Sequence, residues 1–141
     1  MRYFLCPFEG FSLGVPEDSV AAIMIYSEEI SETIKKEKNS GDLFFSLPHF
    51  FKLAGQTVRH GIILKTFTEG DPRNILLVSS VEREADIFPE EIFPLPKILE
   101  ESDRFSFFTG IRIGGEGMIV FIDPADLIAR ILKDAEGGPA E

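Results

Sequence analysis

Apolar residues gather in short runs of strand-forming residues separated by turns. The first two runs, residues 3–8 and 11–15, are joined by Glu9-Gly10, a pattern typical of a tight hairpin. A third run, residues 20–26, follows a Pro-Glu-Asp-Ser turn. The start of the chain therefore predicts three short β-strands.

The longest apolar runs lie in the middle of the chain. Residues 58–68 and 73–81 are linked by a Glu-Gly-Asp-Pro turn and predict a hairpin. In the centre of both runs apolar residues follow one another without alternation, so we expect both faces of this hairpin to be covered. Five residues in these runs and near the C-terminus are expected to be nearly inaccessible to solvent: Ile62, Leu64, Leu76, Val78 and Phe121.

Two segments before this hairpin contain helix signals. Residues 42–47 have strand character, and the proline at the start of 48–53 predicts one helical turn after them. In residues 27–40, charged and polar residues surround only Ile30 and Ile34, whose spacing allows a single apolar stripe. A solvated helix and a mobile loop both fit, and we expect this internal segment to be the least ordered, because so few apolar residues bury little surface.

The C-terminal third predicts a hairpin followed by a helix. Two apolar runs within residues 105–122 flank a glycine-rich turn, and the second stops at Asp123-Pro124, the residue types preferred at a helix N-cap and first position. Residues 86–96 contain three prolines and predict an extended connector with apolar anchors. Residues 1–134 are expected to form one domain, and residues 135–141 a disordered tail.

Composition excludes several classes of protein. The net charge of −10 would repel phosphate backbones, so we expect no nucleic-acid partner. The single cysteine, Cys6, excludes a disulfide scaffold and favours a reducing cytoplasm. The apolar run among the first residues is too short for the hydrophobic region of a signal peptide. No apolar run in the sequence approaches the length of a membrane span. We expect a soluble cytoplasmic protein that is not inserted in a membrane.

The sequence offers little catalytic chemistry. His49 and His60 lack the spaced companions of a zinc site, and His60 is expected to face solvent. Cys6 lies in an apolar strand and is expected to be a small core residue. The glycines from Gly110 to Gly117 lack the Gly-Lys-Ser/Thr ending of a phosphate loop and are explained by a hairpin turn. We therefore expect no enzyme activity, no cofactor and no metal.

In order along the chain, these segments resemble the CheW-like domain family, the adaptor fold of bacterial chemotaxis. The resemblance consists mostly of apolar spacing and glycines in six places: residues 11–20, residues 41–53, residues 75–81, the proline-bearing connector at residues 92–96, Phe108-Thr109-Gly110, and Phe121-Ile122-Asp123 with Leu127. It implies a mainly β fold of two small SH3-like β-barrel subdomains packed together with short helices.

The resemblance also implies a non-enzymatic adaptor that couples a CheA-like histidine kinase to chemoreceptors or to another regulator. The family's Asn-Leu-Arg-Gly signature, associated with receptor binding, is here Lys38-Asn39-Ser40-Gly41, which lacks the arginine. We therefore expect kinase binding to be stronger than receptor binding. A homo-oligomer is also compatible with the sequence.

Exposed apolar positions beside the altered signature are the predicted partner-binding residues: Val20, Gly41, Leu43 and Phe45. Two alternatives remain open, a small β-barrel that binds a low-molecular-weight ligand and a protein-interaction module outside chemotaxis. A closed, roomy apolar pocket would favour the ligand binder, whereas exposed apolar edges would favour an adaptor.

Overall fold

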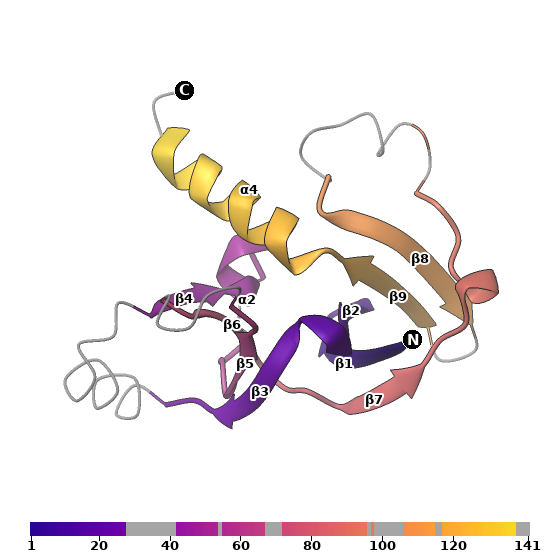
Figure 1. Ribbon diagram of the computed structural model, residues 1–141, viewed down its shortest axis with the longest axis horizontal. Coiled ribbons are helices and arrows are strands. Elements are labelled where there is room, and N and C mark those ends of the chain that lie inside the picture. The colour runs from indigo at the N-terminus through magenta and orange to yellow at the C-terminus, as the bar shows by residue number, and fades with distance from the viewer. Residues whose placement is uncertain are drawn as a thin grey trace. The chain divides into compact units, whose positions relative to one another are not determined.

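The computed structural model describes residues 1–27, 42–53, 55–66, 72–95, 97, 106–114 and 117–137. By its internal contacts the chain divides into unit 1, formed by Met1–Asp18 and Glu82–Glu141, and unit 2, Ser19–Val81. Each unit is built on its own β-sheet, and helices are few, so the fold is mainly β (Figure 1). The segment expected to be least ordered, residues 27–40, lies outside the described residues apart from Ser27.

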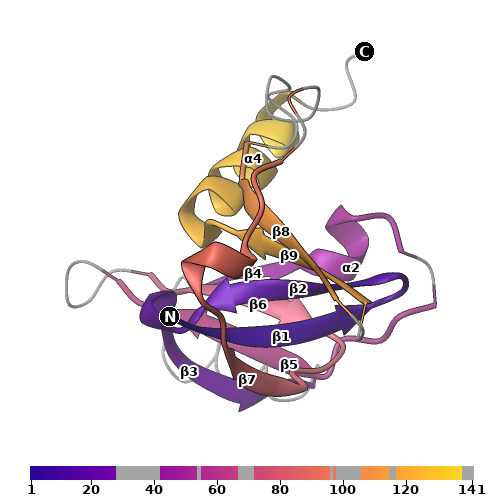
Figure 2. The same ribbon diagram turned by 90° about the vertical axis from the view of Figure 1, so that its right-hand side faces the viewer.

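Unit 1 contains a five-stranded sheet with the order β7-β1-β2-β9-β8. Strands β1 and β2 form one antiparallel hairpin, β8 and β9 form another, and a parallel pairing of β2 with β9 joins the two. In Figure 2, β7, β1 and β2 run side by side. The strands are β1 (Arg2–Phe8), β2 (Phe11–Pro16), β7 (Arg83–Asp86), β8 (Phe108–Gly114) and β9 (Gly117–Ile122).

Both hairpins of unit 1 follow the sequence prediction. Gly10 and Gly117 have positive φ angles of 89° and 108° in the two turns, a conformation that glycine adopts without steric cost. Strand β7 was not predicted, because its sequence Arg-Glu-Ala-Asp lacks apolar alternation. It lies at the sheet edge, where Arg2 of β1 pairs with Glu84 and Asp86.

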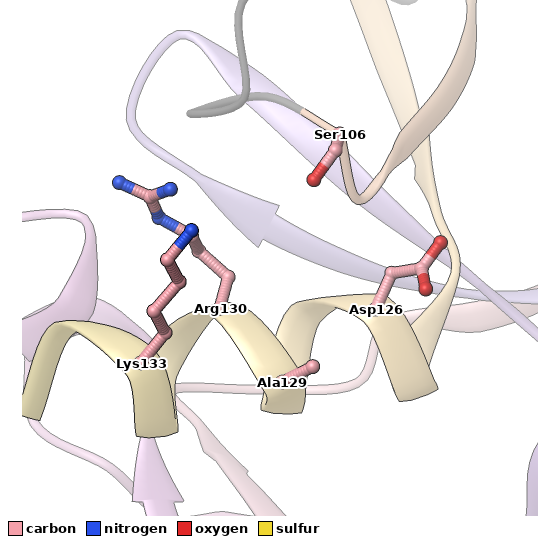
Figure 3. Close-up of a pocket in the computed structure, with 5 residues that line it drawn as sticks. All are labelled: Ser106, Asp126, Ala129, Arg130 and Lys133. Atoms are coloured by element: carbon pink, nitrogen blue, oxygen red, sulfur yellow. The ribbon is translucent and has the colours of Figure 1, made fainter. Parts of the chain in front are cut away.

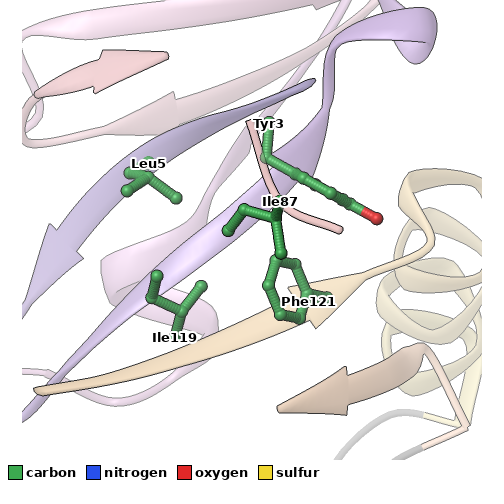
Figure 4. Close-up of a cluster of buried hydrophobic side chains, with 5 residues drawn as sticks. All are labelled: Tyr3, Leu5, Ile87, Ile119 and Phe121. Atoms are coloured by element: carbon green, nitrogen blue, oxygen red, sulfur yellow. The ribbon is translucent and has the colours of Figure 1, made fainter. Parts of the chain in front are cut away.

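The core of unit 1 is a cluster of apolar side chains from both hairpins and from the residue after β7. The rings of Tyr3 and Phe121 lie 4.6 Å apart between centroids, and burial raises the pKa of Tyr3. Gly14 lies against Phe121, where an added Cβ would be 2.7 Å from its ring. Figure 4 shows the cluster: Tyr3, Leu5, Ile87, Ile119 and Phe121.

The C-terminal helix α4 (Pro124–Gly137) begins as predicted. The Asp123 carboxylate accepts hydrogen bonds from the backbone N–H groups of Ala125, at 2.9 Å, and Asp126, at 3.2 Å. On the helix, Leu127 and Ile128 are buried. Residues 135–137 of the expected tail are helical, and residues 138–141 lie outside the described residues.

Unit 2 contains a four-stranded sheet with the order β3-β5-β6-β4. Strands β5 and β6 form the predicted antiparallel hairpin, β3 is antiparallel to β5, and β4 is parallel to β6. Ser46 caps the single-turn helix α2 (Leu47–Phe50) by accepting a hydrogen bond from the His49 N–H. The strands are β3 (Val20–Ile25), β4 (Leu43–Ser46), β5 (His60–Leu64) and β6 (Asn74–Val78), and the 3-10 turn η1 (Glu17–Ser19) precedes β3.

Both faces of the β5–β6 hairpin are covered, as predicted. Ile62 pairs with Leu76 on one face and Ile63 with Ile75 on the other, and all four side chains are buried. All five predicted core residues are confirmed as buried: Ile62, Leu64, Leu76, Val78 and Phe121. In the described part of the chain the hydrogen-bonded ladders do not close either sheet into a barrel, and the two sheets are compatible with SH3-like subdomains.

Candidate interaction surfaces

The predicted partner-binding residues differ in how exposed their side chains are. Leu43 is exposed, at 45% of its full accessible surface, but Val20 and Phe45 are each only 8% exposed. Gly41 lies outside the described residues. The expectation of exposed side chains is therefore wrong for Val20 and Phe45.

Strand register explains the difference. Phe45 lies opposite Leu76 in the sheet and Val20 lies opposite Leu64, and both of those partners are buried core residues. Since neighbouring residues in register point to the same face of a sheet, Phe45 and Val20 point into the core of unit 2. Leu43 lies two residues before Phe45, at the start of β4, where its neighbour in register is the polar Asn74.

The position of Leu43 is fixed by its neighbour Asp42. The Asp42 carboxylate accepts hydrogen bonds from the backbone N–H of Arg73 at 3.0 Å and from its guanidinium at 2.7 and 3.1 Å. The backbone N–H of Leu43 then donates to the Arg73 carbonyl at 2.9 Å. Leu43 is thus an exposed apolar side chain on a firmly held backbone.

The opposite edge of the same sheet also exposes apolar side chains. Ile23 and Ile25 on β3 are 36% and 71% exposed. Sequence reasoning missed them because residues 20–26 are apolar throughout, and nothing in the run distinguishes its solvent side from its core side. Both edge strands of the unit 2 sheet therefore offer apolar contact area.

In unit 1 the predicted connector, residues 86–96, contains a 3-10 turn, η2 (Pro89–Glu91), and runs from one edge of the sheet to the other. It starts at the edge strand β7, and Phe93 then exchanges two backbone hydrogen bonds with Ile111 on β8, at 2.7 and 2.9 Å. The apolar anchor expected in this segment is Ile87, which is 2% exposed and belongs to the core of unit 1. Phe88 and Phe93, by contrast, are 65% and 58% exposed.

A hollow of about 270 Å³ lies along α4, lined by Ser106, Asp126, Ala129, Arg130 and Lys133. Figure 3 shows Arg130 and Lys133 extending from the helix on one side and the Ser106 hydroxyl directed toward the space beside them. Arg130 also pairs with Asp134 at 3.1 Å. The hollow is open and lined by charged groups, so it is not the closed apolar pocket that would favour a ligand-binding barrel.

Three reactive side chains that the sequence singled out lie among the described residues: Cys6, His49 and His60. Cys6 is fully buried, and burial raises the pKa of its thiol to about 12, so it is not a thiolate at neutral pH. His60 does not simply face solvent as expected, because its Nδ1 is buried without a hydrogen-bond partner. Over the described ranges, no three His, Cys, Asp or Glu side chains come together as metal ligands would.

Within the part of the chain that the structure describes, none of the helices combines the length and the apolar character needed to cross a membrane.

No family model and no curated protein matches this chain in sequence. Among solved structures, the fold is similar to the scaffolding protein TtCheW from Thermoanaerobacter tengcongensis, with a TM-score of 0.57 and 18% identity over 86% of this chain and 83% of that one. This similarity shows the fold class: the chain has a CheW-like fold with two sheets and few helices. The mainly β, CheW-like fold class implied by the resemblance in sequence is thereby confirmed.

Proposed function

We propose that this protein is a non-enzymatic adaptor of chemotaxis-type signalling in the bacterial cytoplasm. The observation that carries the proposal is a CheW-like fold whose edge strands expose apolar side chains. The structurally similar TtCheW is itself described as a scaffolding protein. An adaptor acts by holding partners in position, so it needs apolar contact surfaces and no catalytic groups.

Leu43 is the residue on which we expect partner binding to depend most. Its side chain is exposed, and the ion pair of Asp42 with Arg73 holds its backbone in place. Little conformational entropy is lost when a residue on such a backbone is covered, which favours its use as a contact. Gly41 would allow a partner to approach the backbone beside Leu43 closely, because glycine has no side chain.

The partner we propose is a CheA-like histidine kinase. The Asn-Leu-Arg-Gly signature associated with receptor binding is reduced here to its glycine, Gly41. A guanidinium that could pair with a receptor carboxylate is therefore missing from that position. Receptor contact is accordingly weaker than kinase contact, or another regulator replaces the receptor.

The test is direct binding of the purified protein to the regulatory domain of a CheA-like kinase and, separately, to a receptor signalling fragment. We expect Leu43→Asp to weaken kinase binding by about 30-fold or more, the effect of losing roughly 2 kcal/mol at a hot spot. Leu132→Asp is the matched control, because Leu132 is 43% exposed on α4 of unit 1 and Leu43 is 45% exposed. Both variants should keep the wild-type thermal unfolding midpoint.

Failure to bind either the kinase or the receptor would contradict the adaptor function. If a small metabolite then raised the unfolding midpoint, the ligand-binding alternative would replace it, with the charged hollow along α4 as the first place to examine.

A further inference from the structure

One face of the β8–β9 hairpin carries a row of apolar side chains, most of them exposed. Phe93 lies opposite Ile111, and Ile113 lies opposite Met118. Opposite residues in antiparallel pairs share a face, as do residues two apart on one strand, so these four side chains lie on the same face of the sheet. We call this row the hairpin patch: Phe93, Ile111, Ile113 and Met118.

The hairpin patch is the exposed part of an otherwise buried face. Val120 and Ile122 continue the same face along β9 and are 8% and 1% exposed. In the patch, by contrast, Ile113 is 69% exposed, Phe93 58% and Met118 37%. Adjacent apolar side chains left in water at the end of a buried face are typical of an interaction surface.

The backbone that presents this patch is fixed from both sides. The Glu91 carboxylate accepts a hydrogen bond from the Phe88 N–H at 3.0 Å and pairs with Arg112 of β8 at 3.3 Å. Gly110 allows the chain after η2 to lie against β8, since a Cβ there would be 2.5 Å from Ile92. The position of Phe93 beside Ile111 therefore does not depend on a partner.

Charge indicates what kind of molecule covers the patch. Unit 1 contains 17 of the 24 acidic residues and only 7 of the 14 lysines and arginines, whereas unit 2 contains 7 of each, so the entire net charge of −10 belongs to unit 1. Residues 82–91, which lead to Phe93, contain five acidic residues and one arginine. Such a unit repels a second copy of itself, nucleic acids and anionic lipid, and attracts a cationic partner.

We propose that the hairpin patch binds a basic amphipathic segment of a partner protein, with apolar side chains seated on Ile113 and Met118 and with lysines or arginines facing the exposed Glu90, three residues before Phe93. The inference rests on the proposed adaptor function, and it adds a surface on unit 1 to the one around Leu43 on unit 2. With one surface on each unit, the adaptor would have a contact for each of two partners.

The test measures binding of a synthetic peptide of Leu and Lys with helical spacing, and of the same peptide with Glu in place of Lys. We expect the Leu/Lys peptide to bind at least about tenfold more tightly than the Leu/Glu peptide, with an affinity that falls as salt is added. The double variant Ile113→Ser/Met118→Ser leaves the charge unchanged and should weaken Leu/Lys binding by about tenfold or more. Ile25→Ser, at an equally exposed position on unit 2, is the control and should leave binding unchanged.

Three results would overturn the proposal. The first is equal binding of the two peptides. The second is unchanged Leu/Lys binding by an Ile113→Ser/Met118→Ser variant that unfolds at the wild-type midpoint. The third is sedimentation of the wild-type protein as a dimer and of this variant as a monomer. Leu43→Asp separates the two proposals, because it should weaken kinase binding and leave peptide binding intact. Peptide binding without kinase binding would contradict the proposed function alone.

Discussion

Asp42 and Arg73 form a partly buried ion pair in unit 2: the carboxylate accepts three hydrogen bonds from Arg73, the shortest of them 2.7 Å. The Asp42 side chain is 3% exposed and that of Arg73 is 34% exposed. The pair joins the start of β4 to the start of β6, two strands that are parallel neighbours. The ion pair therefore holds the β4 backbone in place at the end of the sheet where Leu43 is exposed.

Replacing Asp42 with Ala should destabilise the protein by about 1–3 kcal/mol, because the Arg73 guanidinium and backbone N–H lose their acceptor in a partly buried place. Chemical denaturation with far-UV circular dichroism would measure the loss. Arg2→Ala is the control, since Arg2 pairs with Glu84 and Asp86 at the surface, where all three side chains are more than 40% exposed. A loss for Asp42→Ala no larger than for Arg2→Ala would contradict the structural role of the buried pair.

A methyl group at Gly110 should disturb the packing of the connector beside β8. The new Cβ would lie 2.5 Å from Ile92 and 2.9 Å from the carbonyl oxygen of Phe93, and the second of these is backbone that cannot rotate away. We expect Gly110→Ala to cost about 1–3 kcal/mol, in the range of overpacked sites. Thermal unfolding measures the effect.

Gly114→Ala is the matched control for this prediction, because a Cβ at Gly114, on the same strand, would meet nothing within 4 Å. If both alanine variants unfolded at the same temperature, the close approach of the connector to Gly110 would not hold in solution.

Truncation of Leu76 tests the core of unit 2. Leu76 is fully buried, and its neighbours in register, Ile62 and Phe45, are buried with it. Leu76→Ala should cost about 2–5 kcal/mol, the range for removing a buried leucine side chain and leaving a cavity. Leu132→Ala, at a 43% exposed position, should cost far less. Denaturant midpoints for the two variants provide the comparison.

The sequence predicted the elements whose signals are local. The helix start depends on the side-chain cap of Asp123, and the two turns depend on the positive φ angles of Gly10 and Gly117. Each of these signals is encoded in one or two residues. The continuous apolar runs of β5 and β6 likewise predicted burial on both faces. These predictions needed no knowledge of which strands pair across the sheet.

The candidate surfaces could not be predicted in the same way, because exposure depends on register between distant segments. Phe45 is buried because Leu76 lies beside it, and Phe93 joins the hairpin patch because it pairs with Ile111. Strand β7 forms at an edge where ion pairs with Arg2 replace an apolar pattern. Long-range pairing of this kind leaves no periodic signal in the sequence.

Alkaline pH should destabilise unit 1 through Cys6. Burial raises the pKa of the Cys6 thiol from its ordinary value of 9.0 to about 12, because the apolar interior disfavours the thiolate. Between pH 9 and 12 the Cys6 thiol therefore stays protonated in the folded state but loses its proton in the unfolded state. The contribution of Cys6 to the free energy of unfolding is fully present below pH 9. It is lost as the pH rises from 9 to 12, by at most about 1.4 kcal/mol per pH unit.

Denaturant unfolding of wild type and Cys6→Ala between pH 8 and pH 11 measures this contribution. Cys6→Ala should be less stable than wild type at pH 8, because a buried sulfur is removed, but its stability should fall less steeply above pH 9. The remaining slope includes Tyr3, whose pKa is also raised by burial, and Tyr3→Phe should reduce it further. Parallel stability curves for wild type and Cys6→Ala across this window would show that Cys6 is accessible to water, and they would contradict its place in the core.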